Sequence, residues 1–89
     1  METPFEVGKA YFFRTVTYHV VGRVARIVGN FVEFDEKTMS WVADSGRFTQ
    51  AINDGNLDEV EPIDVLGGVS LGAIVDNFEW KHELPRTQK

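Results

Sequence analysis

The chain of 89 residues contains no cysteine. It therefore has no disulfide framework, no thiolate ligand for a metal ion and no cysteine nucleophile. Histidine is scarce as well, and neither His19 nor His82 belongs to a set of ligands with the spacing of a zinc site. We expect no metal centre and no bound cofactor.

Long apolar runs are also missing. No stretch approaches the ~20 apolar residues that a membrane-spanning helix needs. The segment Met1–Pro4 has neither the basic residues nor the apolar core of a signal peptide. We therefore expect no membrane contact and a cytoplasmic location, or a location inside a virion if the protein comes from a phage.

The charge is acidic and unevenly distributed. The net charge is −5, and residues 34–64 alone hold eight Asp or Glu and two Lys or Arg. Nucleic-acid binding generally requires a basic surface, so this charge argues against a nucleic-acid partner. An acidic middle segment is instead suited to meet a basic patch on a partner protein.

The first half of the chain has the composition of a β meander. Four segments rich in aromatic and β-branched residues are separated by short turns, with a turn signal at Gly29-Asn30 and a predicted bend at Gly22. In the second segment Val20, Val24 and Val28 are expected on one face. The predicted strands are residues 11–18, 19–28, 31–34 and 38–43.

After residue 43 the pattern changes. Phe48, Ala51 and Ile52 follow the i, i+3, i+4 spacing of a short helix, which we place within residues 44–54. Two further extended segments are predicted beyond this helix. They are residues 60–63 and residues 69–75.

These elements predict a mainly β fold. We expect residues 1–89 to form one small barrel, SH3-like or Sm-like, with about five to six strands and one short helix after the fourth strand. Residues 77–89 are predicted to be a C-terminal tail that docks on a neighbouring molecule.

Residues 68–72 spell G-x-S-x-G, and Asp76 and His82 follow in the chain order of an α/β-hydrolase triad. That motif requires a helix after the serine and a large parallel sheet beneath it. Here residues 73–75 continue as predicted strand, and 89 residues are too few for such a sheet. No isolated carboxylate pair is present for acid–base chemistry. We predict no catalytic residues and no enzymatic activity.

The first predicted hairpin carries basic and aromatic side chains, a combination that binds single-stranded nucleic acid in other proteins. The alternative is a solvated sheet face whose arginines pair across strands with Glu33 or Glu6. The candidate nucleic-acid face consists of Arg14, Tyr18, His19, Arg23 and Arg26.

A protein contact is predicted from other apolar residues. Trp80 and Leu84 are large apolar side chains on an otherwise polar tail, and tryptophan is enriched at binding hot spots. Tyr11 and Phe13 lie on a first strand that no later lysine or proline protects from edge pairing. We expect these four residues in the interface of a homo-oligomer or larger assembly. The alternative for Trp80 is packing over its own domain.

Six sequence blocks carry a family resemblance, namely residues 14–19, 22–23, 41–48, 59–62, 72–76 and 80–86. Together they resemble an uncharacterised family of small bacterial and bacteriophage proteins. The resemblance implies a phage or prophage setting and no particular functional residues. The predicted meander, with Gly22 in a bent strand and a Gly29-Asn30 turn, also resembles Sm-like and SH3-like small barrels.

The sequence thus predicts a non-enzymatic structural or assembly protein, which acts through self-association or by docking into a larger complex. The alternative is an Sm-like or OB-like module that binds single-stranded nucleic acid.

Overall fold

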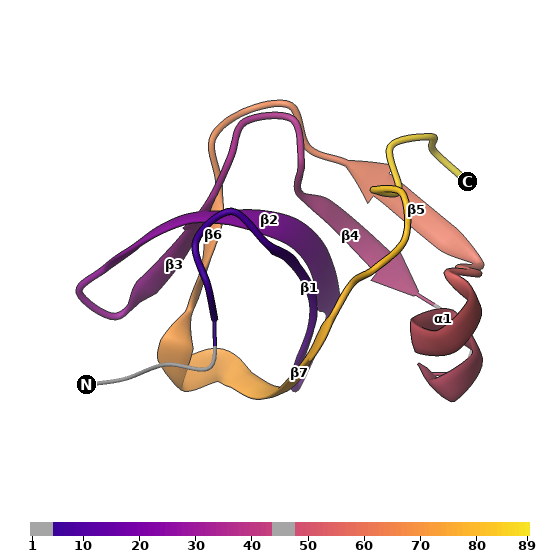
Figure 1. Ribbon diagram of the computed structural model, residues 1–89, viewed down its shortest axis with the longest axis horizontal. Helices are drawn as coiled ribbons and strands as arrows, with labels where there is room; N and C mark the ends of the chain where they lie inside the picture. The colour runs from indigo at the N-terminus through magenta and orange to yellow at the C-terminus, as the bar shows by residue number, and fades with distance from the viewer. Residues whose placement is uncertain (1–4, 44–47) are drawn as a thin grey trace.

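The computed structural model describes residues 5–43 and 48–89. Within them, seven strands, one short α-helix and one 3-10 turn follow one another along the chain, and every strand pair is antiparallel (Figure 1). The mainly β class and the short helix after the fourth strand are confirmed. The elements are β1 Ala10–Thr15, β2 His19–Val28, β3 Phe31–Phe34, β4 Ser40–Ala43, α1 Phe48–Asp54, β5 Glu59–Pro62, β6 Gly68–Ser70, η1 Leu71–Ala73 and β7 Ile74–Glu79.

The long strand β2 connects two sheets. Its first half lies between β1 and β4, in a sheet of order β5-β4-β2-β1-β7, and its second half pairs with β3, which pairs with β6. Figure 1 shows β2 curving across the molecule from the β2–β3 hairpin toward β4 and β5. The turn η1 connects β6 to β7 along the chain, but no backbone pairing joins these two strands in the described part. The sheet is therefore not closed into a barrel.

The bend of β2 has two causes. Gly22 lies against the ring of Phe34, where an added Cβ would be 2.7 Å from Cδ1 of that ring. A register shift then occurs between Val24 and Arg26. Because of this shift, Ile27 packs toward the core while Val28 is 47% exposed. The prediction that Val28 shares the buried face of Val20 and Val24 is wrong.

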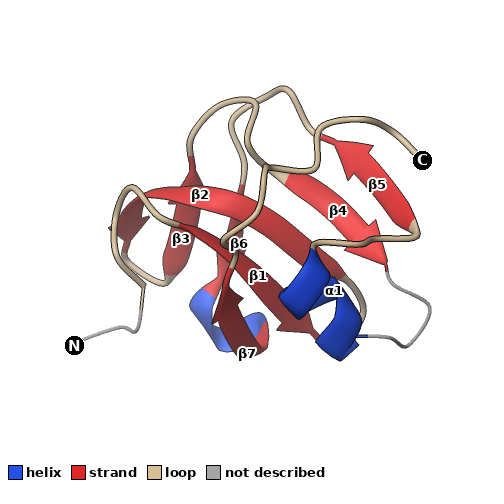
Figure 2. Ribbon diagram, turned by 45° about the vertical axis from the view of Figure 1, so that its right-hand side comes forward, coloured by secondary structure: helices blue, strands red, loops and turns tan. Residues whose placement is uncertain are grey.

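Two hydrophobic cores lie on opposite sides of β1, because consecutive strand residues point to opposite faces. Phe13 belongs to the first core and Phe12 to the second. The helix α1 contributes Ala51 to the second core and so covers that face of the sheet (Figure 2). The buried members of the first core are Phe5, Tyr11, Phe13, Val20, Val24, Val32, Phe34, Met39 and Val69. Those of the second are Phe12, Val21, Val42, Ala51, Leu57, Val60 and Trp80.

The C-terminal segment packs on its own domain. The Trp80 indole is 4% exposed and stacks on Phe12, with ring centroids 6.1 Å apart. Leu84 packs against the same core. Further along, the Pro85 carbonyl accepts a hydrogen bond from Ser40 Oγ at 2.5 Å, and the Lys89 amide donates to the Val60 carbonyl. In this structure the tail closes the second core of its own chain and does not present Trp80 to a neighbour.

Three element predictions need correction. The fourth strand begins at Ser40, after the predicted residue 38. The extended segment predicted over residues 69–75 is divided by the 3-10 turn, which separates β6 from β7. The first strand ends at Thr15, before the predicted residue 18. The predicted helix is present from Phe48, while its predicted start at residues 44–47 lies outside the described residues. Within the described residues, no helix has the length and apolar character to cross a membrane.

Candidate functional surfaces

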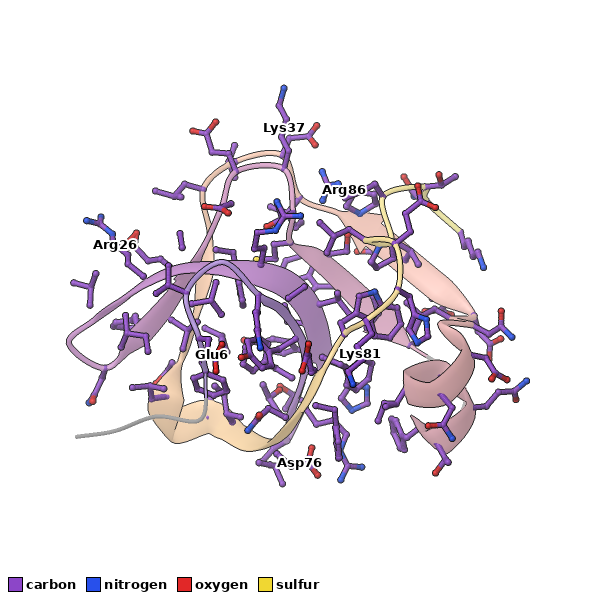
Figure 3. All side chains as sticks on the ribbon, in the orientation of Figure 1. Glu6, Arg26, Lys37, Asp76, Lys81 and Arg86 are labelled. Carbon is purple, nitrogen blue, oxygen red and sulfur yellow. The ribbon has the colours of Figure 1, made fainter. Side chains whose placement is uncertain are left out.

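The structure distributes the candidate nucleic-acid residues over separate places. Arg14 and His19 are register partners on the β1–β2 hairpin, and His19 packs edge-on against Phe48 of α1. Arg23 lies farther along β2, opposite Ala10. Arg26 follows the bulge and is held by Glu33. Figure 3 shows Arg26 and the partner of Arg14, Asp76, at different edges of the molecule.

The arginine pairing follows the solvated-face alternative in part. Arg26 Nε donates to Glu33 Oε2 at 2.7 Å across the β2–β3 pair. Arg14 Nε donates to Asp76 Oδ1 at 2.7 Å, its Nη2 contacts the other carboxylate oxygen, and its guanidinium lies 4.8 Å from the centroid of the Phe48 ring. Glu6, the other predicted partner, pairs with Lys9 instead. These two arginines are thus already engaged by carboxylates of the same chain.

The Arg14 hydrogen bond holds the pKa of Asp76 below its usual range, and burial opposes the shift. A carboxylate whose pKa is lowered by folding stabilises the fold above its unfolded pKa of ~3.9, and this contribution disappears as the pH falls through the folded pKa. We expect Asp76→Asn to lower the free energy of unfolding by about 1 kcal/mol at pH 7. Urea unfolding from pH 7 downward should show the difference between wild type and variant shrinking once the pH falls below the unfolded pKa of ~3.9. A difference in the free energy of unfolding between wild type and variant that is as large at the lowest pH as at pH 7 would contradict this role of Asp76.

The serine of the G-x-S-x-G sequence lies in β6, where Ser70 is paired with Phe31. The 3-10 turn, not an α-helix, follows it, so the prediction that Ala73 continues a strand is wrong. The two other residues of the triad order have different partners. Asp76 is bound by Arg14, and His82 Nε2 lies 2.8 Å from the Ile52 carbonyl. Both are thus engaged outside β6.

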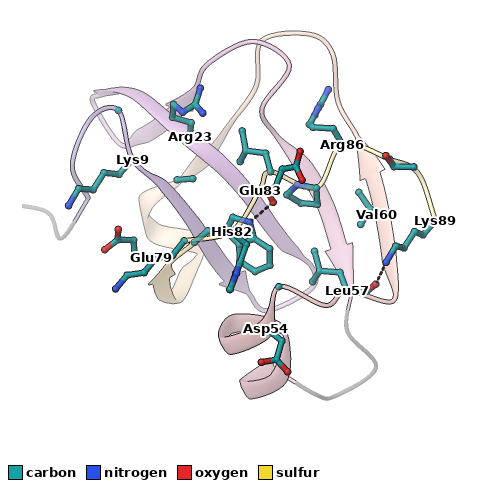
Figure 4. Close-up of a pocket in the computed structure, with 18 residues that line it drawn as sticks. Lys9, Arg23, Asp54, Leu57, Val60, Glu79, His82, Glu83, Arg86 and Lys89 are labelled. Carbon is teal, nitrogen blue, oxygen red and sulfur yellow. Dashed lines mark hydrogen bonds between the residues drawn. The ribbon is translucent and has the colours of Figure 1, made fainter.

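A hollow of about 1010 Å³ runs along the C-terminal segment (Figure 4). Two of its basic side chains, Arg86 and Lys89, fasten this segment to the domain. Arg86 donates to the carbonyl oxygens of Met39 and Ile63 and to the carboxylate of Asp64, and Lys89 Nζ donates to the Leu57 carbonyl. We interpret this hollow as the seam where the tail meets the sheet.

A second hollow of about 480 Å³ lies beside β3 and β6. We call it the apolar groove, and its large apolar side chains are Val28, Phe31 and Leu66, which are 47%, 55% and 56% exposed. Val65, at 72% exposed, precedes Leu66 in the chain. The groove is completed by Glu33, Gly67 and Gly68.

The predicted interface residues lie elsewhere. Tyr11 is 5% exposed and Phe13 is fully buried, because the first core covers them, so they offer no surface to a neighbour in this structure. Sequence reasoning missed the apolar groove. The available signal was the pair Val65-Leu66 directly before Gly67-Gly68, where a loop carries two large apolar residues with no strand or helix period to bury them.

No group of three or more His, Asp or Glu side chains that could hold a metal ion occurs in the ranges 5–43 and 48–89. Comparisons of the chain with protein-family models, with curated proteins and with solved structures find no match.

Proposed function

We propose that this protein is a non-enzymatic assembly protein that associates with further copies of itself through the apolar groove. The observation that carries the proposal is the exposure of Val28, Phe31 and Leu66 side by side on the wall of one hollow. Exposed apolar side chains that gather in one patch, and are not scattered singly, are typical of sites of association. Since Trp80 and Leu84 pack on their own domain, the contact surface is assigned to the groove and not to the tail.

The unpaired backbone edge of β6, next to the apolar groove, favours a second copy of the chain as the partner that fills the groove. Within the described chain, β6 pairs with β3 alone, so its other edge has no strand partner. Unpaired edges are commonly covered by pairing with another strand. Antiparallel pairing of β6 with β6 of a second copy about a two-fold axis would bring two apolar grooves together. Such a contact uses the same surface on both copies and closes as a dimer.

The fold proposed with this function is a small SH3-like barrel. Supporting it, the pairings run continuously through β7, β1, β2, β3 and β6, and η1 links the two strands at the ends of this series. The β4–α1–β5 segment is then an extension of the barrel. The resemblance of the sequence to small bacterial and bacteriophage proteins supports a virion or related particle as the larger assembly in this proposal.

The mass in solution tests the proposal. We expect the mass of the wild type to rise with concentration to that of a dimer or a larger assembly in light scattering. Phe31→Glu places a charge in the groove and should weaken association at least about tenfold, because burying an unpaired charge is costly. The control is Val16→Glu, which alters a residue that is 88% exposed outside the groove and should leave the mass unchanged.

Circular dichroism of both variants checks that they are folded. A wild type that remains monomeric up to millimolar concentration would sink the proposal. So would a folded Phe31→Glu variant that associates as well as the wild type.

A further inference from the structure

The β4–β5 pair has one covered and one open face. Val42 and Val60 are register partners that point into the second core, on the side covered by α1. The next pair along the strands is Trp41 and Glu61, which must point to the opposite side because strand side chains alternate. The Trp41 side chain is 43% exposed, and Glu61 is exposed as well. The molecule thus carries a sheet face that the helix does not cover.

Two aromatic side chains, Tyr18 and Trp41, lie in contact on this open face, and we call this pair the aromatic corner. Tyr18 immediately precedes β2, whose residue Val20 is the register partner of Trp41. The Tyr18 ring meets the Trp41 ring nearly at right angles, with centroids 6.3 Å apart and planes at 72°. Tyr18 is 42% exposed, so both rings reach solvent. In this edge-to-face pair each residue stays partly open to solvent, and an exposed aromatic face attracts a cation.

Negative charge adjoins the corner. Glu61 is directly opposite Trp41, at the short cross-strand separation of register partners, and Glu59 is opposite Ala43 on the same face. Glu6, Glu33, Asp64 and Asp76 all form ion pairs within the chain. Neither Glu59 nor Glu61 has such a partner among residues 5–43 and 48–89. Within the part of the chain that the structure describes, no side chain neutralises their charge.

We propose that this acid–aromatic face, formed by Tyr18, Trp41, Glu59 and Glu61, binds a lysine or arginine side chain from an extended segment of a basic partner protein. An aromatic face and a carboxylate both favour a cation, and few other ligand groups satisfy both. The net charge of −5 favours the approach of a basic chain and opposes that of a nucleic acid. The face lies on β4 and β5, separate from the apolar groove, so this proposal does not depend on self-association.

Titration calorimetry with short peptides tests the proposal. The probe is a decapeptide of alternating arginine and glycine, and the comparison peptide has glutamate in place of arginine. We expect saturable binding of the arginine peptide that weakens as salt is raised from 50 to about 300 mM, because exposed charges are screened. The glutamate peptide should not bind. Absence of saturable binding of the arginine peptide at low salt would overturn the proposal.

Variants locate the binding. Trp41→Leu should weaken the affinity for the arginine peptide about fivefold through the lost cation–π contact. Glu61→Gln should weaken it about threefold through the lost charge pair. The matched control is Glu36→Gln, which removes the same charge from an exposed turn between β3 and β4 and should change affinity by less than about twofold. An equal loss in Glu36→Gln and Glu61→Gln, or none in Trp41→Leu, would show nonspecific charge attraction and contradict the site.

Discussion

Replacing Trp80 by alanine is expected to lower the free energy of unfolding by about 3–5 kcal/mol, because a large buried side chain leaves a cavity that the surroundings fill only partly. The indole is 4% exposed and stacks on Phe12, and its Nε1 donates to the Glu83 carbonyl at 3.1 Å. The substitution removes both the apolar packing and this hydrogen bond. The backbone hydrogen bond from the Trp80 amide to the Ala10 carbonyl, where the tail leaves β7, remains possible in the variant.

The second tryptophan of the chain provides the control. Trp41→Ala removes an indole that is 43% exposed, and its cost should stay below about 1.5 kcal/mol. Urea unfolding, followed by far-ultraviolet circular dichroism, measures both values. A domain of this size has a total free energy of unfolding of roughly 5–15 kcal/mol. The urea midpoint of Trp80→Ala should therefore lie well below that of Trp41→Ala. Equal losses in the two variants would contradict the burial assigned to Trp80.

Local pattern was sufficient for much of the fold. The strands His19–Val28 and Phe31–Phe34 have their predicted bounds, since a run of β-branched and aromatic residues ends there at a Gly29-Asn30 turn. The short helix lies within its predicted range because Ala51 follows Phe48 at helical spacing and becomes buried. In these elements the deciding interactions are close in sequence.

The points that the sequence left open, missed or predicted wrongly involve contacts that are distant in sequence. Whether Trp80 covers its own core depends on an apolar surface around Phe12 and Val21, and nothing near Trp80 in the chain reports that surface. The bulge that exposes Val28 arises from the pairing of β2 with β3, which a period-2 pattern does not encode. The apolar groove was missed for the same reason, because Phe31 and Leu66 meet only after the fold has formed.

Among substitutions of glycine by alanine, we expect Gly68→Ala to lower the free energy of unfolding most. A Cβ at this position would lie 2.4 Å from the Val32 carbonyl oxygen and 3.3 Å from the Glu33 Cα. These are backbone atoms of the paired strand β3, so they cannot rotate away as a side chain would. To admit the methyl group, β6 must shift away from β3, which strains the pairs Val32–Val69 and Glu33–Gly68. We therefore expect Gly68→Ala to destabilise the protein by about 2–3 kcal/mol.

The other glycine of the G-x-S-x-G sequence gives a matched control. A Cβ at Gly72 would meet only Ser70 Oγ, at an ordinary contact distance of 3.8 Å. Gly72→Ala should therefore be neutral, or stabilise the protein by up to about 1 kcal/mol because alanine restricts the unfolded chain. Urea unfolding of both variants separates the two positions. A loss in Gly72→Ala as large as that in Gly68→Ala would refute the steric argument. The expected asymmetry means that Gly68 is required for the close approach of two strands, while Gly72 has no comparable contact to protect.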